Sequence, residues 1–267
     1  MKINEIIEYA IKEDMPSGDA TTDSIFSNES STANFVIKES GVISGIEVTK
    51  LVYSYFDGVN LEFFFSDGDK VTSGDLLGKI TGLTKSILKG ERIALNIMQR
   101  MSGIATTTRK YVDEVSEYDT KILDTRKTTP NLRVLEKQAV LHGGGTNHRF
   151  SLSDMVMIKD NHIKAAGSIA EAIKRVKKNS DLKIEVEVEN LEMFHLAQLE
   201  DIDVIMLDNM SNEDMAIAVT LNNDKILEAS GNVTLDRLVD IAKTGVDYIS
   251  VGALTHSYKS LDISLKF

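Results

Sequence analysis

The chain has 267 residues, of which 42% are hydrophobic and 27% charged, and its formal net charge is -11. This composition is ordinary for a globular protein of one large or two smaller domains. The absence of cysteine excludes disulfide bonds, thiolate metal sites and a cysteine nucleophile. A sequence pI near 5.0 argues against general nucleic-acid binding.

The N-terminal segment MKINEIIEYAIKEDM places apolar residues among Glu and Lys at helical spacing. It lacks the uninterrupted apolar core of a secretory signal peptide. No later segment approaches the apolar length that a membrane span requires. We therefore expect a cytoplasmic protein that does not associate with membranes.

The first hundred residues have the pattern of a small α+β unit. An amphipathic helix is predicted at 3–13 and another near 46–55, with strand-like runs at 33–38, 61–65 and 76–81. A longer helix is predicted over about 85–101, with an apolar stripe formed by Ile87, Leu88, Ala94, Leu95, Met98 and Met101. Arg92, Asn96 and Gln99 lie on another face, which by itself is typical of a solvent-exposed surface.

From about residue 120, strand-like runs alternate with helix-like segments. The strands are predicted at 120–125, 155–159, 183–189, 203–209, 225–231 and 248–253, and the helices at 131–141, 168–178, 191–199, 212–222 and 234–243. Ser168, Asn212 and Thr234 are candidate helix N-caps. The alternation predicts parallel strands with right-handed crossovers, in a doubly wound sheet or in a barrel of fewer than eight strands.

Polar residues or glycines stand at the ends of all six predicted strands. They are Thr125–Lys127, Lys159–His162, Glu187 and Glu189, Asp208–Asn209, Ser230–Asn232 and Gly252–Ala253. Both candidate architectures place their sites at the carboxyl ends of parallel strands. The pattern therefore predicts a functional site at this end of the sheet.

A basic island lies within this acidic chain. Residues 121–164 contain eight Lys/Arg and four Asp/Glu, a local charge of +4, and three of the five histidines. A solvated face or an ion-pair network would explain such a run, but its position beside glycines and strand ends favours anion binding. The stretch LHGGGTNHRF (141–150) is neither a P-loop nor a G-x-G-x-x-G motif, and its glycines fit a flexible turn and an anion site about equally.

The strand IEVEVE places Glu185, Glu187 and Glu189 on one face. On an edge strand that face would meet solvent, whereas inside a barrel the carboxylates need cations or a metal. Asp208 adds an acid at the next strand end, and carboxylates with a substrate phosphate suit Mg²⁺. The glycine-containing turns ASGN and SVGA favour phosphate binding. The histidines lack zinc-site spacing.

These motifs together resemble the quinolinate phosphoribosyltransferase family over nearly the whole chain. The matching stretches are EDMPSGDATT (13–22), ERIALNIMQRMSGIAT (91–106), DTRKTTPNLR (124–133), GGGTNHR (143–149), MIKDNH (157–162), EVEVEN (185–190), LDN (207–209), ASGN (229–232) and TGVDYISVGALTHS (244–257). The resemblance implies conversion of quinolinate and phosphoribosyl pyrophosphate to nicotinate mononucleotide, CO₂ and pyrophosphate, in de novo NAD biosynthesis. It implies Mg²⁺ and no organic cofactor.

The resemblance also implies a fold and an assembly. An α/β sandwich domain would occupy 1–103 and be joined by the C-terminal segment 255–267, and an incomplete parallel α/β barrel of about six strands would occupy 104–254. The family's unit is a homodimer whose active site is shared between subunits. The sequence leaves open whether dimers assemble into hexamers.

Matching by motif carries the family's site residues onto this chain. Quinolinate binding is implied for Arg126, His148, Arg149 and Lys159, with Arg92 of the partner subunit. Lys127, Glu187 and Asp208 match the catalytic residues that contact ribose, pyrophosphate and metal. Glu187 and Asp208 are the candidate metal ligands, and the sequence leaves open which of them contacts Mg²⁺ and which contacts ribose. The remaining substrate-binding positions are Thr125, Ser230, Gly231, Asn232, Val251, Gly252 and Ala253.

Two asparagines depart from the family pattern, since Asn131 and Asn232 stand where glycine is common. Asparagine tolerates left-handed backbone geometry, so we expect both loops to keep their shape. We interpret His148 and Arg149 as a clamp for the substrate carboxylates, with the three preceding glycines as its hinge.

Two alternative functions remain. A relative of the same fold could use another nucleobase-like acid, but NHR (147–149) and the complete DTRKTTP favour quinolinate. A non-catalytic protein could bind phosphorylated sugars, but it would not need both Glu187 and Asp208.

Overall fold

The computed structural model describes residues 2–267, which form two compact units. One unit comprises residues 2–109, 128–144 and 254–267, and the other comprises 110–127 and 145–253. The sequence placed the division near residue 103 and residue 254. It did not predict that 128–144 would group with the N-terminal unit.

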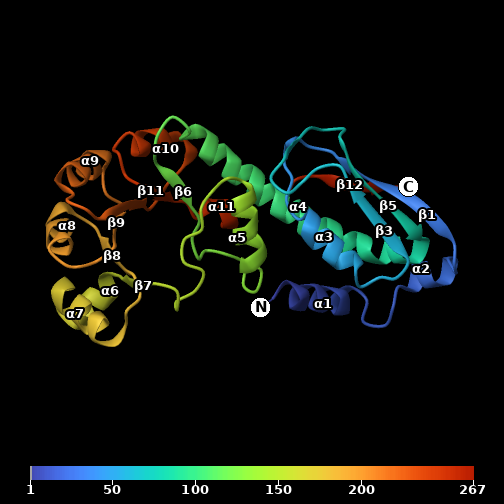
Figure 1. Cartoon of the computed structure of the whole chain (residues 1–267), viewed down its shortest axis with the longest axis horizontal. Coiled ribbons are helices and arrows are strands. Elements are labelled where there is room, and N and C mark those ends of the chain that lie inside the picture. Colours follow the sequence, from blue (N-terminus) through green and yellow to red (C-terminus); the bar gives the residue numbers. More distant parts are fainter. Residues whose placement is uncertain (1) are drawn as a thin grey trace. The chain divides into compact units, whose positions relative to one another are not determined.

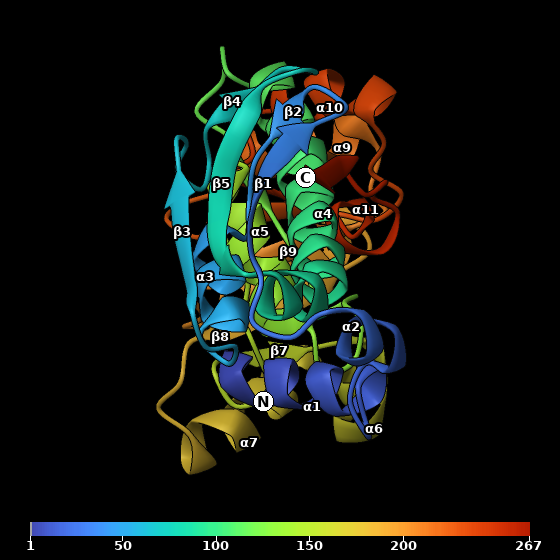
Figure 2. The same cartoon turned by 90° about the vertical axis from the view of Figure 1, so that its right-hand side faces the viewer.

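The first unit contains a four-stranded antiparallel sheet with the order β12-β1-β5-β3. Its strands are β1 (Ser30–Ile37), β3 (Val59–Phe63), β5 (Leu76–Leu83) and β12 (Ile263–Lys266), and Figure 2 shows β3, β5 and β1 side by side. β12 comes from the C-terminal segment and pairs with β1. β2 (Gly41–Val42) and β4 (Lys70–Val71) form a separate pair.

Two of the helices in this part of the chain lie near their predicted positions, one was not predicted, and one is longer than predicted. α1 (Ile3–Asp14) and α3 (Ile46–Tyr53) were predicted, whereas α2 (Ala20–Ile25) was not among the predicted helices. Asp19 caps α2 by accepting hydrogen bonds from the backbone N–H groups of Thr21 and Thr22. α4 (Thr84–Glu114) is far longer than predicted, because its buried stripe continues through Ile104, Ala105 and Tyr111.

A buried ion pair explains why residues 128–144 belong to the first unit. Nε of Arg100 on α4 donates to Oε1 of Glu136 at 3.1 Å, and Glu136 lies on α5 (Arg133–His142) with no exposed surface. Oε2 of Glu136 accepts from the backbone N–H of Thr129, also at 3.1 Å. The Arg100 guanidinium lies 5.0 Å from the centre of the Tyr258 ring. A buried carboxylate needs such partners, and they hold this segment against α4.

The second unit contains a six-stranded parallel sheet with the order β6-β11-β10-β9-β8-β7. The strands are β6 (Lys121–Leu123), β7 (Val156–Ile158), β8 (Ile184–Val188), β9 (Val204–Asp208), β10 (Ile226–Ser230) and β11 (Tyr248–Ser250). This confirms the predicted parallel α/β architecture with six strands. β6 and β7 are the two ends of the ladder, and within residues 2–267 they are not paired with each other, as an incomplete barrel requires.

Helices line the outside of this curved sheet, as Figure 1 shows for α7 to α10. They are α6 (Asp160–Ala166), α7 (Ile169–Asn179), α8 (Leu191–Gln198), α9 (Asn212–Leu221) and α10 (Leu235–Ala242). α11 (Ala253–His256) follows β11, and its residues from Leu254 onward group with the first unit. α6 and α11 were not predicted. Of the proposed caps, Ser168 is confirmed, Thr234 occupies its position without a side-chain bond, and Asn212 is wrong because Ser211 accepts the hydrogen bond.

No helix within residues 2–267 combines the length and the apolar character that crossing a bilayer requires.

Candidate functional site

Alternate residues of four neighbouring strands form one polar face of the parallel sheet. The strand register pairs Met157 with Glu185, Glu187 with Met206, Glu228 with Met206 and Ser230 with Asp208. Since side chains alternate along a strand, these residues project to the same side. Polar side chains from β8, β9 and β10 therefore converge near the carboxyl ends of their strands.

Glu185 and Glu187 on β8, and Glu189 directly after it, become more exposed toward the end of the strand. Glu185 is 0% exposed, the side chain of Glu187 is 12% exposed, and Glu189 is exposed. Val186 and Val188 are buried on the opposite face. The alternation predicted for this strand is confirmed, and its place between β7 and β9 excludes a solvent-facing edge strand.

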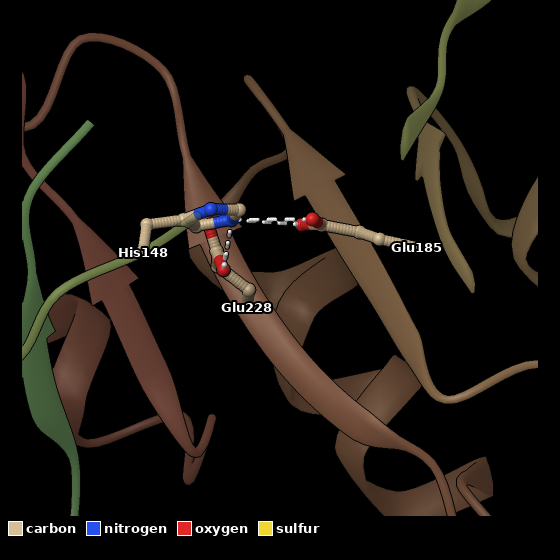
Figure 3. Close-up of side chains that lie close together, drawn as sticks. All are labelled: His148, Glu185 and Glu228. Atoms are coloured by element: carbon tan, nitrogen blue, oxygen red, sulfur yellow. Dashed lines mark hydrogen bonds and ion pairs between the residues drawn. The ribbon is translucent and has the colours of Figure 1, made fainter. Parts of the chain in front are cut away.

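The ring of His148 lies between the carboxylates of Glu185 and Glu228 (Figure 3). Nε2 of His148 is 3.1 Å from Oε2 of Glu185 and 3.3 Å from Oε2 of Glu228. Glu185 comes from β8 and Glu228 from β10, so the ring bridges two strands that are separated by β9. All three side chains are at most 8% exposed, so their charges interact with little screening by water.

This cluster retains a proton at neutral pH. Burial lowers the pKa of His148, but the hydrogen bonds and charges of the two glutamates raise it above its ordinary value. Burial also raises the pKa of Glu185. The backbone N–H of Arg149 donates to Nδ1 of His148 at 2.7 Å. A second ring proton on Nδ1 would face this donor, so the ring carries a single proton in this geometry. The ring proton attracted by the carboxylates is accordingly the one on Nε2.

The side chain of Arg149 beside this cluster is repelled by the charge of Arg126 and attracted by Glu185 and Asp154. The side chain of Arg149 donates from Nη1 to the carbonyl oxygen of Met155 at 3.0 Å, and its Nη2 is 3.4 Å from Sδ of Met157. Burial lowers the pKa of Arg149, and the positive charge of Arg126 lowers it further. Two cations that repel each other in a partly buried place favour an anionic ligand between them.

Lys159 lies directly after β7 and adds another cation to this end of the sheet. Its Nζ forms an ion pair with Oε2 of Glu187, across the β7–β8 edge of the polar face. Lys127 follows β6, is exposed, and donates its backbone N–H to Oγ1 of Thr125 at 3.0 Å. The cations expected at the strand ends thus lie in one unit, and two of them, His148 and Lys159, are held by glutamates.

A hydrogen-bonded chain links the ends of β9 and β10. Nδ2 of Asn232 donates to Oδ1 of Asn209 at 3.0 Å, and Nδ2 of Asn209 donates to Oδ2 of Asp208 at 2.8 Å. Asn232 has a φ of 48°, so it adopts the left-handed conformation expected of it. At Gly231 an added Cβ would lie 2.3 Å from the Asn209 amide oxygen, which explains the glycine there. Asn131 is also left-handed, with a φ of 68°.

The glycines that precede His148 have packing roles. An added Cβ at Gly143 would lie 2.5 Å from Cβ of Thr108 and 2.6 Å from the carbonyl oxygen of Ala105, so only glycine allows this contact with α4. Gly144 has a φ of 87°. Close packing and a left-handed turn, rather than a hinge, account for these two glycines.

The second unit therefore brings together most of the predicted site residues. Ser230 ends β10, and Gly231 and Asn232 follow it. Val251 and Gly252 connect β11 to α11, which begins at Ala253. Arg92 is exposed on α4 in the first unit.

Two residues were missed by the sequence analysis. Asp124 is fully buried and accepts the backbone N–H of His148 at 2.8 Å, and Glu228 contacts the His148 ring. In the sequence, the only sign that either residue belongs to the site is a single acid beside an apolar run.

The whole chain is similar to one family of enzymes. Residues 19–102 match the family model "Quinolinate phosphoribosyl transferase, N-terminal domain", and residues 104–266 match the model of the C-terminal domain. A "Probable nicotinate-nucleotide pyrophosphorylase [carboxylating]" of Bacillus subtilis is 44% identical, covering 99% of this chain and 93% of the relative. A "Quinolinate phosphoribosyltransferase [decarboxylating] 2b, mitochondrial" of Nicotiana tabacum is 44% identical, with 99% and 82% covered.

Solved structures agree with the sequence matches. The crystal structure of NadC from Streptococcus pyogenes superposes with a TM-score of 0.95 at 44% identity, covering 99% of this chain and 95% of that one. The nicotinate-nucleotide pyrophosphorylase of Francisella tularensis gives a TM-score of 0.95 at 40% identity, with 99% and 95% covered. With both domain models matched and relatives identical at this level over the full length, the chain belongs to the quinolinate phosphoribosyltransferase family.

Proposed function

We propose that this chain catalyses the reaction for which its relatives are named: quinolinate and phosphoribosyl pyrophosphate give nicotinate mononucleotide, CO₂ and pyrophosphate, a step of NAD biosynthesis. One observation in the structure supports this proposal in addition to the family membership. In a chain of net charge -11, Arg126 and Arg149 lie close enough to repel each other at the end of the parallel sheet. Quinolinate is a dianion at neutral pH, and its two carboxylates would neutralise this pair.

The quinolinate subsite follows from the positions of the cations. Arg126 and Arg149 offer planar forks suited to carboxylates, and Lys159 at the end of β7 offers a compact charge. The cluster of His148 with its two glutamates lies beside them. We assign the two carboxylates of quinolinate to Arg126, Arg149 and Lys159, which orient the ring nitrogen toward the ribose.

The phosphoribosyl donor is assigned to the ends of β9, β10 and β11. Asp208 and Glu187 lie on the polar face, where a carboxylate stabilises the positive charge that develops on the ribose as the C1–pyrophosphate bond breaks. The turns after β10 and β11 present backbone N–H groups to the 5′-phosphate. Lys127, which is exposed after β6, is assigned to the leaving pyrophosphate.

Mg²⁺ suits the donor set at the end of β9. Glu187 is already paired with Lys159, whereas Asp208 accepts one hydrogen bond from the Asn209 amide. A carboxylate with water and pyrophosphate oxygens is the ligand set that Mg²⁺ prefers, so Asp208 is the better candidate of the two acids. When bound there, the ion would neutralise charge on the pyrophosphate.

Decarboxylation needs no organic cofactor. The ring nitrogen of quinolinate forms a bond to C1 of the ribose as pyrophosphate leaves, and the ring becomes a pyridinium. This ring accepts the electron pair of the C2–carboxylate bond as CO₂ departs, and a proton then takes the vacated position at C2. The residues around the ring must hold the remaining carboxylate while one carboxylate is lost.

A related activity is the main alternative. The human nicotinic acid phosphoribosyltransferase shares the fold, with a TM-score of 0.62 at 10% identity. A monocarboxylate acceptor would not need a second carboxylate-binding group. The cluster of cations at the ends of β6 and β7 therefore favours the dicarboxylate.

The direct test is an assay of purified protein with phosphoribosyl pyrophosphate, Mg²⁺ and either quinolinate or nicotinate. We expect nicotinate mononucleotide and CO₂ in equal amounts from quinolinate and no product from nicotinate. Chelation of Mg²⁺ should abolish the reaction. Product formed from nicotinate but not from quinolinate would contradict the proposal.

Arg149→Ala should raise the KM for quinolinate by about 100-fold, since truncating a charged partner of this kind costs about 2–5 kcal/mol. The KM for phosphoribosyl pyrophosphate should change little. Steady-state kinetics with each substrate varied in turn would measure both values. Arg175→Ala is the matched control, because Arg175 pairs with the exposed Glu171 on α7. Equal losses for the two substrates would rule out the role given to Arg149.

We also propose a cytoplasmic homodimer in which Arg92 of the partner subunit contributes to each quinolinate site, as the resemblance implies. Arg92 is exposed on α4 and so is available to a second copy. Mixing Arg92→Ala with Arg149→Ala subunits should restore activity to about a quarter of the wild-type value, because half of randomly formed dimers hold one intact site of two. Mixed dimers that form but stay inactive would contradict the shared site.

A further inference from the structure

The buried cluster of His148, Glu185 and Glu228 is more than a structural ion pair. Glu185 and Glu228 are almost fully buried, and Oε1 of Glu228 has no hydrogen-bond partner within the described residues. Two desolvated carboxylates cost stability, and apolar residues of similar size are often neutral or stabilising in such places. Glu228 in particular would be unfavourable in an otherwise apolar strand unless it served the site.

The His148 ring connects this cluster to the backbone of Arg149. The ring is held through Nε2 by the two glutamates, and its backbone N–H is held by Asp124 at 2.8 Å. Nδ1 of the ring accepts the backbone N–H of Arg149 at 2.7 Å. Both ring nitrogens are thus engaged by the protein, and the backbone from which the Arg149 side chain projects is tied to the interior of the sheet.

We propose that Glu228, acting with Glu185, is a positioning residue for quinolinate binding: it fixes the His148 ring, which fixes the main-chain amide of Arg149 and thereby aims its guanidinium at the substrate carboxylate. This inference rests on the proposed function for the identity of the substrate. It also gives His148 a role that the motif comparison did not, since the ring acts through its neighbour.

A divalent metal is the competing explanation for the cluster. The possible ligand atoms of His148, Glu185 and Glu228 all lie within 4.8 Å of one another. A metal on Nε2, however, requires the ring proton on Nδ1, where a metal-bound histidine normally donates to an acceptor. Here Nδ1 meets the Arg149 N–H, which is itself a donor. The contact therefore favours a proton over a metal at Nε2.

The test compares two substitutions of Glu228. Glu228→Met keeps the volume of the side chain but removes the acceptor, whereas Glu228→Gln keeps an acceptor oxygen. We expect Glu228→Met to raise the KM for quinolinate at least about tenfold, since small misplacements of a binding group are costly. The KM for phosphoribosyl pyrophosphate should stay within about twofold, and Glu228→Gln should recover most of the loss. Glu192→Met, at an exposed position on α8, is the control.

Several results would overturn the proposal. They are an unchanged quinolinate KM in Glu228→Met, equal rises for both substrates, or Glu228→Gln as impaired as Glu228→Met. Stoichiometric Zn²⁺ binding by titration calorimetry that Glu228→Met abolishes would assign the cluster to a metal instead. Thermal unfolding of each variant shows whether a loss reflects misfolding, and we expect Glu228→Met to be at least as stable as the wild type.

Nuclear magnetic resonance of the histidine rings tests the geometry without the reaction. Proton–nitrogen correlation spectra of the wild type should show Nε2 of His148 protonated, and the signal should change in both Glu228 variants, more in Glu228→Met. An unprotonated Nε2 in the wild type would contradict the positioning role even if the enzyme is active. Inactivity toward quinolinate with Nε2 protonated would instead contradict the proposed function.

Discussion

Desolvated carboxylates on the inner face of the parallel sheet are the constraint on which the second unit depends. Glu185 and Glu187 project from β8 and Glu228 from β10, to a side where water is scarce, so each must meet a cation or a proton. Nε2 of His148 contacts Glu185 and Glu228, and the Lys159 ammonium forms an ion pair with Glu187. The cations come from the segment around β7, and the acids thereby hold that segment against the sheet.

This arrangement separates two kinds of charge along the strand direction. The acids that lie deepest are paired within the protein, whereas Arg149 at the strand ends is repelled by Arg126 as well as attracted by Glu185 and Asp154. A dianion relieves this repulsion, and loss of one carboxylate as CO₂ would leave a product with fewer charges for the site to hold. Substrate affinity and product release would then have the same electrostatic origin.

The sequence predicted the features that depend on local pattern. Alternation along β8 placed its glutamates on one face, and the polar strand ends of the second unit did converge. Features that depend on distant partners were not predictable. Glu228 is one acid in an apolar strand, and only the fold brings it to His148. Likewise, Glu136 ties residues 128–144 to Arg100, a contact across 36 positions that no local signal announces.

The most direct measurement of the central claim is a crystal structure of the protein with quinolinate bound in the absence of phosphoribosyl pyrophosphate. We predict that its two carboxylates contact Arg126, Arg149 and Lys159 at the ends of β6 and β7, with His148 still between Glu185 and Glu228. Quinolinate bound away from these cations, or a His148 ring released from the glutamates to contact it, would contradict the account.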